Sequence, residues 1–189
     1  MINKNILFFM PSIEGSGVEK NLFIVSNYFS KKFKNVTLIT SSIKFKSKFN
    51  KRIKIISPNN IFLENFGRKI KYLVCIFLLL IQIIKKNEII FFSFQANIYC
   101  IIICKLFSVK VVSRSNSAPI GWSKNFIKNF IFRFVLKLSN EVLVNSYQFK
   151  NDLKKEFNIN ARVIYNPLNK REIIKKSKQK TKKIFYSNK

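Results

Sequence analysis

The sequence predicts an α/β protein with a Rossmann-like parallel sheet and helices on both faces. Short apolar runs rich in β-branched residues alternate along the chain with longer segments of helical periodicity, as is typical of parallel sheets. The first run, residues 5–10, is apolar from Ile6 to Met10, as expected of a central strand buried on both faces. The length of 189 residues and the hydrophobic content of 48 % suit one domain with a short appendage.

The elements follow in order from this alternation. Apolar β-branched runs predict strands at residues 5–10, 36–40, 53–56, 88–93, 109–113, 141–144 and 162–165. Helical spacing predicts helices at residues 17–32, 63–86 with a break near Gly67, 96–107, 122–138, and onward from a cap at Ser146 to residue 157. In the first helix, Val18, Leu22, Val25 and Phe29 form one apolar stripe. Residues 41–51 are expected to be a polar, basic and mobile loop.

The pattern breaks at Asn166-Pro167, because proline cannot continue a helix and restricts the residue before it. We therefore expect a domain at residues 1–167. The lysine-rich residues 168–189 hold too few apolar side chains to pack alone. They are expected to be a basic linker that leads into a second domain.

The charge is strongly positive, with 36 Lys and Arg against 8 Asp and Glu and a formal net charge of +28. The joint excess of Lys, Ile, Asn and Phe indicates an AT-rich coding sequence, which explains much of this charge. Only six of the basic residues are Arg, so nucleic acid is not expected as a partner. Peripheral contact with an anionic membrane is the second interpretation, because lysine serves it well.

The three cysteines, Cys75, Cys100 and Cys104, lie in apolar runs and their odd number excludes a closed disulfide framework. Because the chain has no histidine, a zinc site lacks ligands, and no metal is expected. We expect buried free thiols in a reducing cytoplasm. The start of the chain does not have the pattern of a signal peptide. The longest apolar run, residues 72–84, is too short for a spanning helix and indicates a buried or interfacial one.

The loop Glu14-Gly-Ser-Gly-Val-Glu-Lys20 is the most informative segment for function. It joins the first strand to the first helix, where small residues let the backbone approach a ligand and the helix start offers free N–H groups. Gly15 and Gly17 are two of only four glycines in the chain. The loop matches neither the dinucleotide-binding nor the Walker glycine pattern. A tight turn without a ligand is the alternative interpretation.

Several segments together carry a resemblance to a known family. The opening Gly15-Ser-Gly-Val-Glu-Lys20, then a helix beginning Asn21-Leu and a strand Asn35-Val-Thr-Leu-Ile-Thr40, is similar to the start of family-4 glycosyltransferases. The resemblance continues downstream in the family's order, over about residues 5–169. Its later segments are Val111-Val-Ser-Arg-Ser-Asn116, Glu141-Val-Leu-Val-Asn-Ser146, Lys150-Asn-Asp-Leu153 and Val163-Ile-Tyr-Asn-Pro167.

The resemblance implies the amino-terminal, acceptor-side half of a two-domain GT-B enzyme. Such an enzyme moves a sugar, with retention, from a nucleotide-sugar donor to a glycan or lipid-linked acceptor in surface polysaccharide synthesis. It implies hexosyl or N-acetylhexosaminyl transfer and a setting in the cytoplasm, peripheral to the inner face of the plasma membrane. The donor is a co-substrate bound through a second domain, and no cofactor or metal is implied. Without that domain, we expect the chain to be inactive.

The resemblance also implies site residues. Substrate-binding positions carried over are Gly15, Ser16, Gly17, Glu19, Lys20, Arg114, Asn116 and Ser146, with Asn166 and Pro167 as the hinge. No catalytic residue can be assigned. Glu19 has an alternative as a first-turn helix residue, Lys20 as a solvated cation, and Ser146 as a plain helix cap. Many family members carry histidine at the tips of the fourth and fifth strands, whereas Ser93, Gln95 and Arg114 stand there in this chain. Two other classes stay open: a non-catalytic Rossmann-like binding module, and a basic membrane or nucleic-acid-binding protein.

Overall fold

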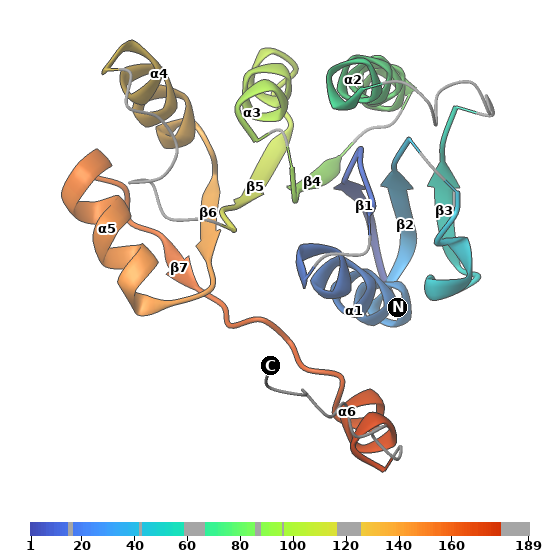
Figure 1. Cartoon of the computed structure of the whole chain (residues 1–189). Coiled ribbons are helices and arrows are strands. Elements are labelled where there is room, and N and C mark those ends of the chain that lie inside the picture. Colours follow the sequence, from blue (N-terminus) through green and yellow to red (C-terminus); the bar gives the residue numbers. More distant parts are fainter. Residues whose placement is uncertain are drawn as a thin grey trace, which may run out of the picture.

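A parallel sheet organises the structure, a computed structural model that describes residues 1–14, 17–41, 43–58, 67–85, 88–95, 97–116 and 126–178. Within these residues the sheet has seven strands in the order β3-β2-β1-β4-β5-β6-β7, and all neighbouring pairs are parallel (Figure 1). The strands are β1 (Ile2–Phe9), β2 (Phe33–Ile39), β3 (Ile53–Ile56), β4 (Ile89–Ser93), β5 (Lys110–Arg114), β6 (Glu141–Val144) and β7 (Arg162–Val163). This is the Rossmann-like α/β fold that the sequence predicts.

The strand order reverses direction once. The chain runs from β1 outward to β3, then returns to place β4 on the other side of β1 and proceeds to β7. In parallel α/β sheets, ligands bind at the carboxyl ends of the strands beside such a switch point. The fold therefore predicts a ligand-binding site at the carboxyl edge next to β1 and β4.

Helices cover both faces of the sheet. They are α1 (Gly17–Lys32), α2 (Arg68–Lys85), α3 (Asn97–Leu106), α4 (Phe126–Lys137), α5 (Tyr147–Phe157) and α6 (Lys170–Ser177), with a 3-10 turn η1 (Lys46–Lys48). Alternate residues of β1 divide the core into two clusters. Ile6 and Phe8 pack with Leu22 of α1, whereas Leu7 and Phe9 pack with residues from α2 to α5. The stripe predicted on α1 is confirmed, because Val18, Leu22, Val25 and Phe29 all join the first cluster.

The segment between β2 and β3 differs from its prediction as a mobile loop. Its described residues form η1 and bury Phe49, whose ring meets that of Phe23 on α1 edge-on at a centroid distance of 4.9 Å. Asn27 of α1 also donates its side-chain N–H to the Lys48 carbonyl at 2.9 Å. The mobile loop was predicted from the polar composition of the segment. Two phenylalanines among its lysines nevertheless anchor it by packing against the core.

The basic segment after Pro167 contains a short helix. Residues 170–177 form α6, for which no secondary structure was predicted. Asn169 caps the start of this helix, because its side-chain Oδ1 accepts the backbone N–H of Glu172 at 3.2 Å. Few apolar residues do not prevent a short capped helix, since Lys, Arg and Glu are good helix formers.

The three thiols lie in the second core cluster, as predicted. Cys75, Cys100 and Cys104 are free and completely buried between the sheet and helices α2 and α3. Burial raises the pKa of Cys75 and of Cys104 to about 12, and it raises the pKa of Cys100 well above its ordinary value. These thiols are therefore protonated and unreactive at neutral pH.

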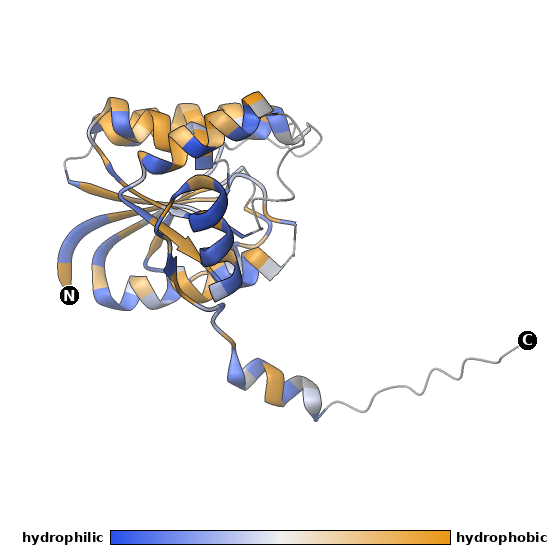
Figure 2. Cartoon of the chain, turned by 90° about the vertical axis from the view of Figure 1, so that its left-hand side faces the viewer, coloured by the Kyte–Doolittle hydropathy of each residue, from blue (hydrophilic) through white to orange (hydrophobic). Residues whose placement is uncertain are grey.

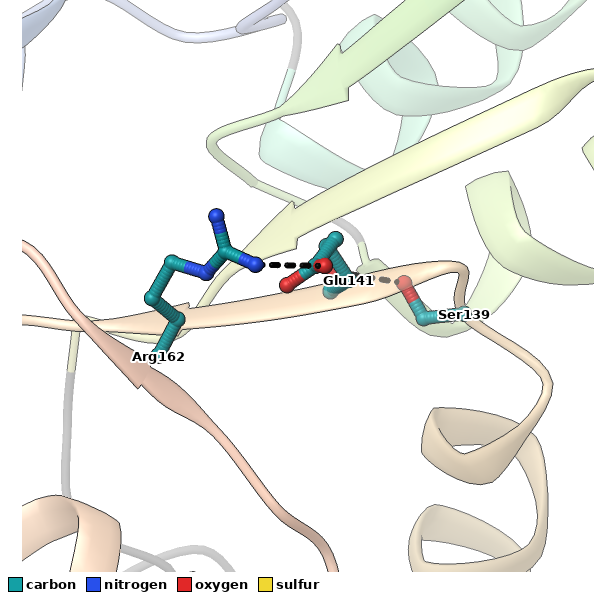
Figure 3. A network of polar contacts seen from close by, with 3 residues as sticks. All are labelled: Ser139, Glu141 and Arg162. Atoms are coloured by element: carbon teal, nitrogen blue, oxygen red, sulfur yellow. Dashed lines mark hydrogen bonds and ion pairs between the residues drawn. The ribbon is translucent and has the colours of Figure 1, made fainter.

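At the amino ends of β6 and β7 a small polar network joins the two strands (Figure 3). Arg162 donates from Nη2 to Glu141 Oε1 at 3.1 Å, and Ser139 Oγ donates to the Glu141 carbonyl at 2.9 Å. The ion pair is solvent-exposed, so it contributes little to stability. It lies at the opposite edge of the sheet from the switch-point edge described above.

Candidate functional site

A cleft of about 600 Å³ opens at the carboxyl edge of the sheet. Its wall combines the start of α1 with the segments that follow β5, β6 and β7. Its lining residues are Gly17, Val18, Lys20, Asn21, Ile24, Asn116, Asn145, Asn166, Pro167, Leu168, Asn169, Glu172 and Ile173. Residues far apart in sequence thus form one concave surface, as the switch-point rule predicts.

The strand ends are aligned by backbone hydrogen bonds that continue the ladders past the strands. The N–H of Phe94 donates to Phe9 at 3.1 Å, that of Ser115 donates to Leu143 at 2.8 Å, and that of Ile164 donates to Val144 at 2.8 Å. These bonds keep the carboxyl ends in step. As a consequence, polar residues just beyond different strands meet at the same edge.

The loop between β1 and α1 is braced from inside the protein. Glu19 is only 2 % exposed, and its Oε1 accepts the backbone N–H of Glu14 at 2.7 Å. Ser12 Oγ donates to Glu14 at 2.7 Å, and the Ser12 N–H donates to the side-chain oxygen of Gln95 beyond β4 at 3.2 Å. A carboxylate at this position thus holds the loop against the first turn of α1 and the β4 tip.

Gly17 is the first residue of α1 and lines the cleft. A Cβ atom added at this position would meet no heavy atom within 4 Å. Packing therefore does not require glycine here. The absence of a side chain instead leaves the backbone at the helix start open toward the cleft, where unpaired N–H groups and the positive helix end attract anions.

Three asparagines supply most of the neutral polar groups at the cleft. Asn116, Asn145 and Asn166 follow β5, β6 and β7, respectively. Asn116 donates a side-chain N–H to the carbonyl of Phe94 at 3.1 Å, which fixes its orientation at the β4 tip. An amide side chain both donates and accepts, so such a group suits hydroxyl-rich ligands.

Arg114 lies behind this wall, at the end of β5. It is buried, and its Nη2 donates to Asn166 Oδ1 at 2.8 Å and more weakly to the carbonyl of Ile164 at 3.4 Å. Its guanidinium lies 5.8 Å from the Phe94 ring centre, and its Nε has no partner among the described residues. Burial lowers the pKa of Arg114 from its ordinary value, which still leaves it charged. Neutral groups thus surround a buried cation next to the cleft.

The residues expected to bind substrate lie in different parts of the structure. Gly17, Lys20 and Asn116 line the cleft, together with the expected hinge, Asn166 and Pro167. The structure places Glu19 and Arg114 in its supporting wall and Ser146 at the start of α5, where its Oγ accepts the N–H of Phe149 at 3.2 Å. Gly15 and Ser16 lie outside the described residues.

Several lining residues were not predicted from the sequence. They are Val18, Asn21, Ile24, Asn145, Leu168, Asn169, Glu172 and Ile173. For Asn145 a signal was present, because it directly follows an apolar strand, as Asn116 nearly does. For the residues of α6 there was none, since nothing local indicates that this helix returns to the edge of the sheet.

Metal-binding clusters and membrane-spanning helices are both missing from the described residues. Among them, no three His, Cys, Asp or Glu side chains gather as a metal site would require. Within the same part of the chain, no helix has the length and apolar character needed to cross a bilayer.

Comparison with known proteins gives similarity at the level of structure. The sequence matches no family model and no curated protein. A glycosyltransferase from Rickettsia africae is similar with a TM-score of 0.62 and 19 % identity, over 86 % of this chain and 43 % of that one. HepE of Anabaena, solved with UDP and glucose, is similar with a TM-score of 0.59 and 13 % identity, over 88 % of this chain and 45 % of its own.

A third similar structure is UGT73P12 of Glycyrrhiza uralensis, in complex with glycyrrhetinic acid 3-O-monoglucuronide. Its TM-score is 0.56 at 11 % identity, over 86 % of this chain and 49 % of that one. The chain thus has the fold of a glycosyltransferase domain of the GT-B type. It spans about 45 % of the length of HepE, which is consistent with one half of that architecture.

Proposed function

We propose that this chain is the amino-terminal, acceptor-side domain of a nucleotide-sugar-dependent glycosyltransferase of family 4. The observation that carries the proposal is the cleft, where the open start of α1 at Gly17 faces three asparagines that follow three neighbouring strands. A helix start suits a diphosphate, and amide side chains suit sugar hydroxyls. The two kinds of group in one cleft match a sugar nucleotide and its acceptor.

The electrostatics of the wall support an anionic ligand. Arg114 is a buried cation whose hydrogen-bond partners are neutral, so its charge is not cancelled locally. Lys20 adds an exposed cation on the first turn of α1, and Glu172 of α6 is the one carboxylate among the described lining residues. Once a second domain shielded the cleft from water, fixed positive groups of this kind would stabilise a departing diphosphate.

A second domain would complete the site in this proposal. Leu168 and Ile173 line the cleft although 79 % and 50 % of their surfaces are exposed, which supports a partner domain on this side. That domain would hold the nucleoside of the donor, while the cleft of this chain would contact the donor's diphosphate and sugar. Asn166-Pro167 would be the hinge, and Glu19 would act by holding the loop. The chain by itself would bind ligand without turnover.

The remaining features of the proposal come from the family resemblance. They are transfer of a hexosyl or N-acetylhexosaminyl group with retention, independence of metal, and a glycan or lipid-linked acceptor. The setting would be surface polysaccharide synthesis in the cytoplasm, peripheral to the inner face of the plasma membrane.

Gly17→Val provides the test, because it places a side chain at the helix start where the fold has room. Saturation-transfer NMR on the purified chain would measure contact with UDP-glucose and UDP-N-acetylglucosamine. We expect the signal to fall about tenfold in Gly17→Val and in Asn145→Ala, since each alters the cleft surface that the ligand meets.

Gly67→Val and Asn35→Ala are the matched controls. Gly67 immediately precedes α2 and likewise has open space around it, and the exposed Asn35 pairs with Asn5 of β1. Both controls should leave the signal unchanged. Equal signals from Gly17→Val and the unaltered chain would refute the proposed role of the cleft.

A further inference from the structure

Helix α2 exposes an apolar stripe on the side that faces away from the sheet. Cys75, Leu79 and Ile83 are its buried side and pack into the core. On the opposite side, Leu73, Phe77 and Ile84 are exposed by 66 %, 62 % and 72 %. A helix on a soluble domain ordinarily turns polar residues outward. The apolar outer face of α2 therefore indicates contact with something other than water.

The two neighbouring helices have the same property. On α3 the exposed apolar residues are Tyr99, Ile102 and Leu106, and on α4 they are Ile127, Phe130, Ile131 and Phe134. Helices α2, α3 and α4 lie in one layer on the same side of the sheet (Figure 1). In Figure 2 this layer is coloured mainly as hydrophobic. We call the outward sides of α2, α3 and α4 the apolar helix face.

Composition does not account for this face. Helix α5 contributes to the same core cluster as these three helices. Apart from Tyr147, its exposed residues are polar or charged: Gln148, Asn151, Lys154, Lys155 and Glu156. A coding bias toward Ile and Phe would act equally on α5, so the difference is local to α2, α3 and α4.

The charged residues of helices α2, α3 and α4 are all basic. Helices α2, α3 and α4 contain no Asp or Glu. Exposed basic residues stand at their ends and flanks: Lys69, Lys85, Lys105, Arg133 and Lys137. Apolar side chains bordered by cations are the pattern of helices that lie in the interface of an anionic membrane.

We propose that the apolar helix face docks on the surface of a bilayer that contains anionic phospholipid. Leu73, Phe77 and Phe130 would enter the boundary between headgroups and acyl chains, while the bordering Lys and Arg bind lipid phosphates. With 18 residues, α2 is about 27 Å long and would lie flat on the membrane.

A second copy of the chain fits this face less well. A symmetric dimer would bring the basic borders of two copies together, with no carboxylate on the three helices to pair with them. The formal net charge of +28 adds repulsion between copies. An anionic surface is attracted by the same charges. This inference does not depend on glycosyl transfer.

Co-sedimentation of the full chain with phospholipid vesicles tests the proposal. Vesicles of equal parts phosphatidylglycerol and phosphatidylcholine should bind the chain, and vesicles of phosphatidylcholine alone should bind it about tenfold more weakly. The variant Leu73→Gln/Phe77→Gln/Phe130→Gln should reduce binding to the anionic vesicles about tenfold or more, because the apolar contribution is lost. Its sites are exposed and Gln is a good helix former, so folding is expected to be retained, as circular dichroism would verify.

The contribution of charge is tested by Lys85→Gln/Arg133→Gln/Lys137→Gln against Lys31→Gln/Lys34→Gln/Lys51→Gln, which removes the same charge from exposed sites elsewhere. At an ionic strength of about 0.1 M, the first variant should bind more weakly than the second, and at about 1 M the difference should disappear. Equal loss in both charge variants would overturn the proposal, because the net charge alone would then drive binding. Unchanged vesicle binding by the apolar variant would also overturn it, as would self-association of the unaltered chain that the apolar variant abolishes.

Discussion

Arg114 presents an unusual energetic situation for a single residue. Its guanidinium is taken out of water, yet its hydrogen-bond partners among the described residues are an amide oxygen and a carbonyl oxygen, which carry no compensating charge. Desolvation of a cation is costly, and the hydrogen bond to Asn166 offsets part of that cost. The residue that follows β7 is thereby coupled to the end of β5, which holds the expected hinge against the sheet.

Two substitutions separate these contributions. Asn166→Ala leaves the buried cation with less support, so the free energy of unfolding should fall by about 1–3 kcal/mol. Arg114→Met removes the charge but keeps an apolar stem of similar length, so it should cost less. Urea unfolding followed by circular dichroism gives both values. A larger loss for Arg114→Met would mean that the cation is a net stabiliser of the fold.

Residue by residue, the site was only partly predictable from the sequence. The position of Gly17 and Lys20 at the start of a helix follows from local sequence, and the structure places both at the cleft. The inward turn of Glu19 does not follow from it, because a first-turn carboxylate can face either solvent or its own loop. The hydrogen bond from the Glu14 N–H fixes the inward orientation of the Glu19 side chain. This bond depends on how β1, α1 and the β4 tip pack.

Among the elements, α5 shows how a cap defines a boundary. Ser146 has an extended backbone, its Oγ accepts the Phe149 N–H, and Asn158 ends the helix in the left-handed conformation at φ 51°. Ser, Thr, Asn and Asp are preferred before a helix, and Asn tolerates a positive φ after it. The predicted bounds of this helix are confirmed for this reason.

Ser146→Ala should lower the free energy of unfolding by about 1 kcal/mol, since one N–H at the helix start loses its acceptor. Ser146→Asp should restore most of the loss. Thermal and urea unfolding would measure both. Glu141→Gln, which removes the exposed ion pair with Arg162, is the comparison and should cost less than Ser146→Ala. No loss in Ser146→Ala would show that water replaces the cap.

For the molecule as a whole, the buried thiols predict how stability depends on pH. Burial raises the pKa of Cys75 and of Cys104 to about 12, whereas in the unfolded chain they ionise near the model-compound value of 9.0. Between these values the unfolded chain holds fewer protons than the folded one. The free energy of unfolding is therefore unaffected by ionisation of these thiols below about pH 9. As the pH rises from there toward 12, it falls by about 1.4 kcal/mol per thiol and pH unit.

Urea unfolding between about pH 8 and pH 11 would check this sign and size. Cys104→Ala should flatten the decline by one thiol's share, and a thiol reagent at pH 8 should label the cysteines only after unfolding. The exposed Lys31→Gln variant serves as the control and should not alter the slope. Rapid labelling of the folded chain would contradict the burial of all three thiols.

What the sequence by itself determined is the series of strands and helices, the central position of β1 and the helix that starts at Gly17. These depend on periodicity, caps and turn residues, which act over a few neighbouring positions. Only the tertiary structure decided that Asn145 joins Asn116 and Asn166, that α6 returns to the cleft, and that α2 to α4 leave their outer sides apolar. Each of these depends on strand order and on which helix side meets the sheet, and such long-range packing leaves no local mark in the sequence.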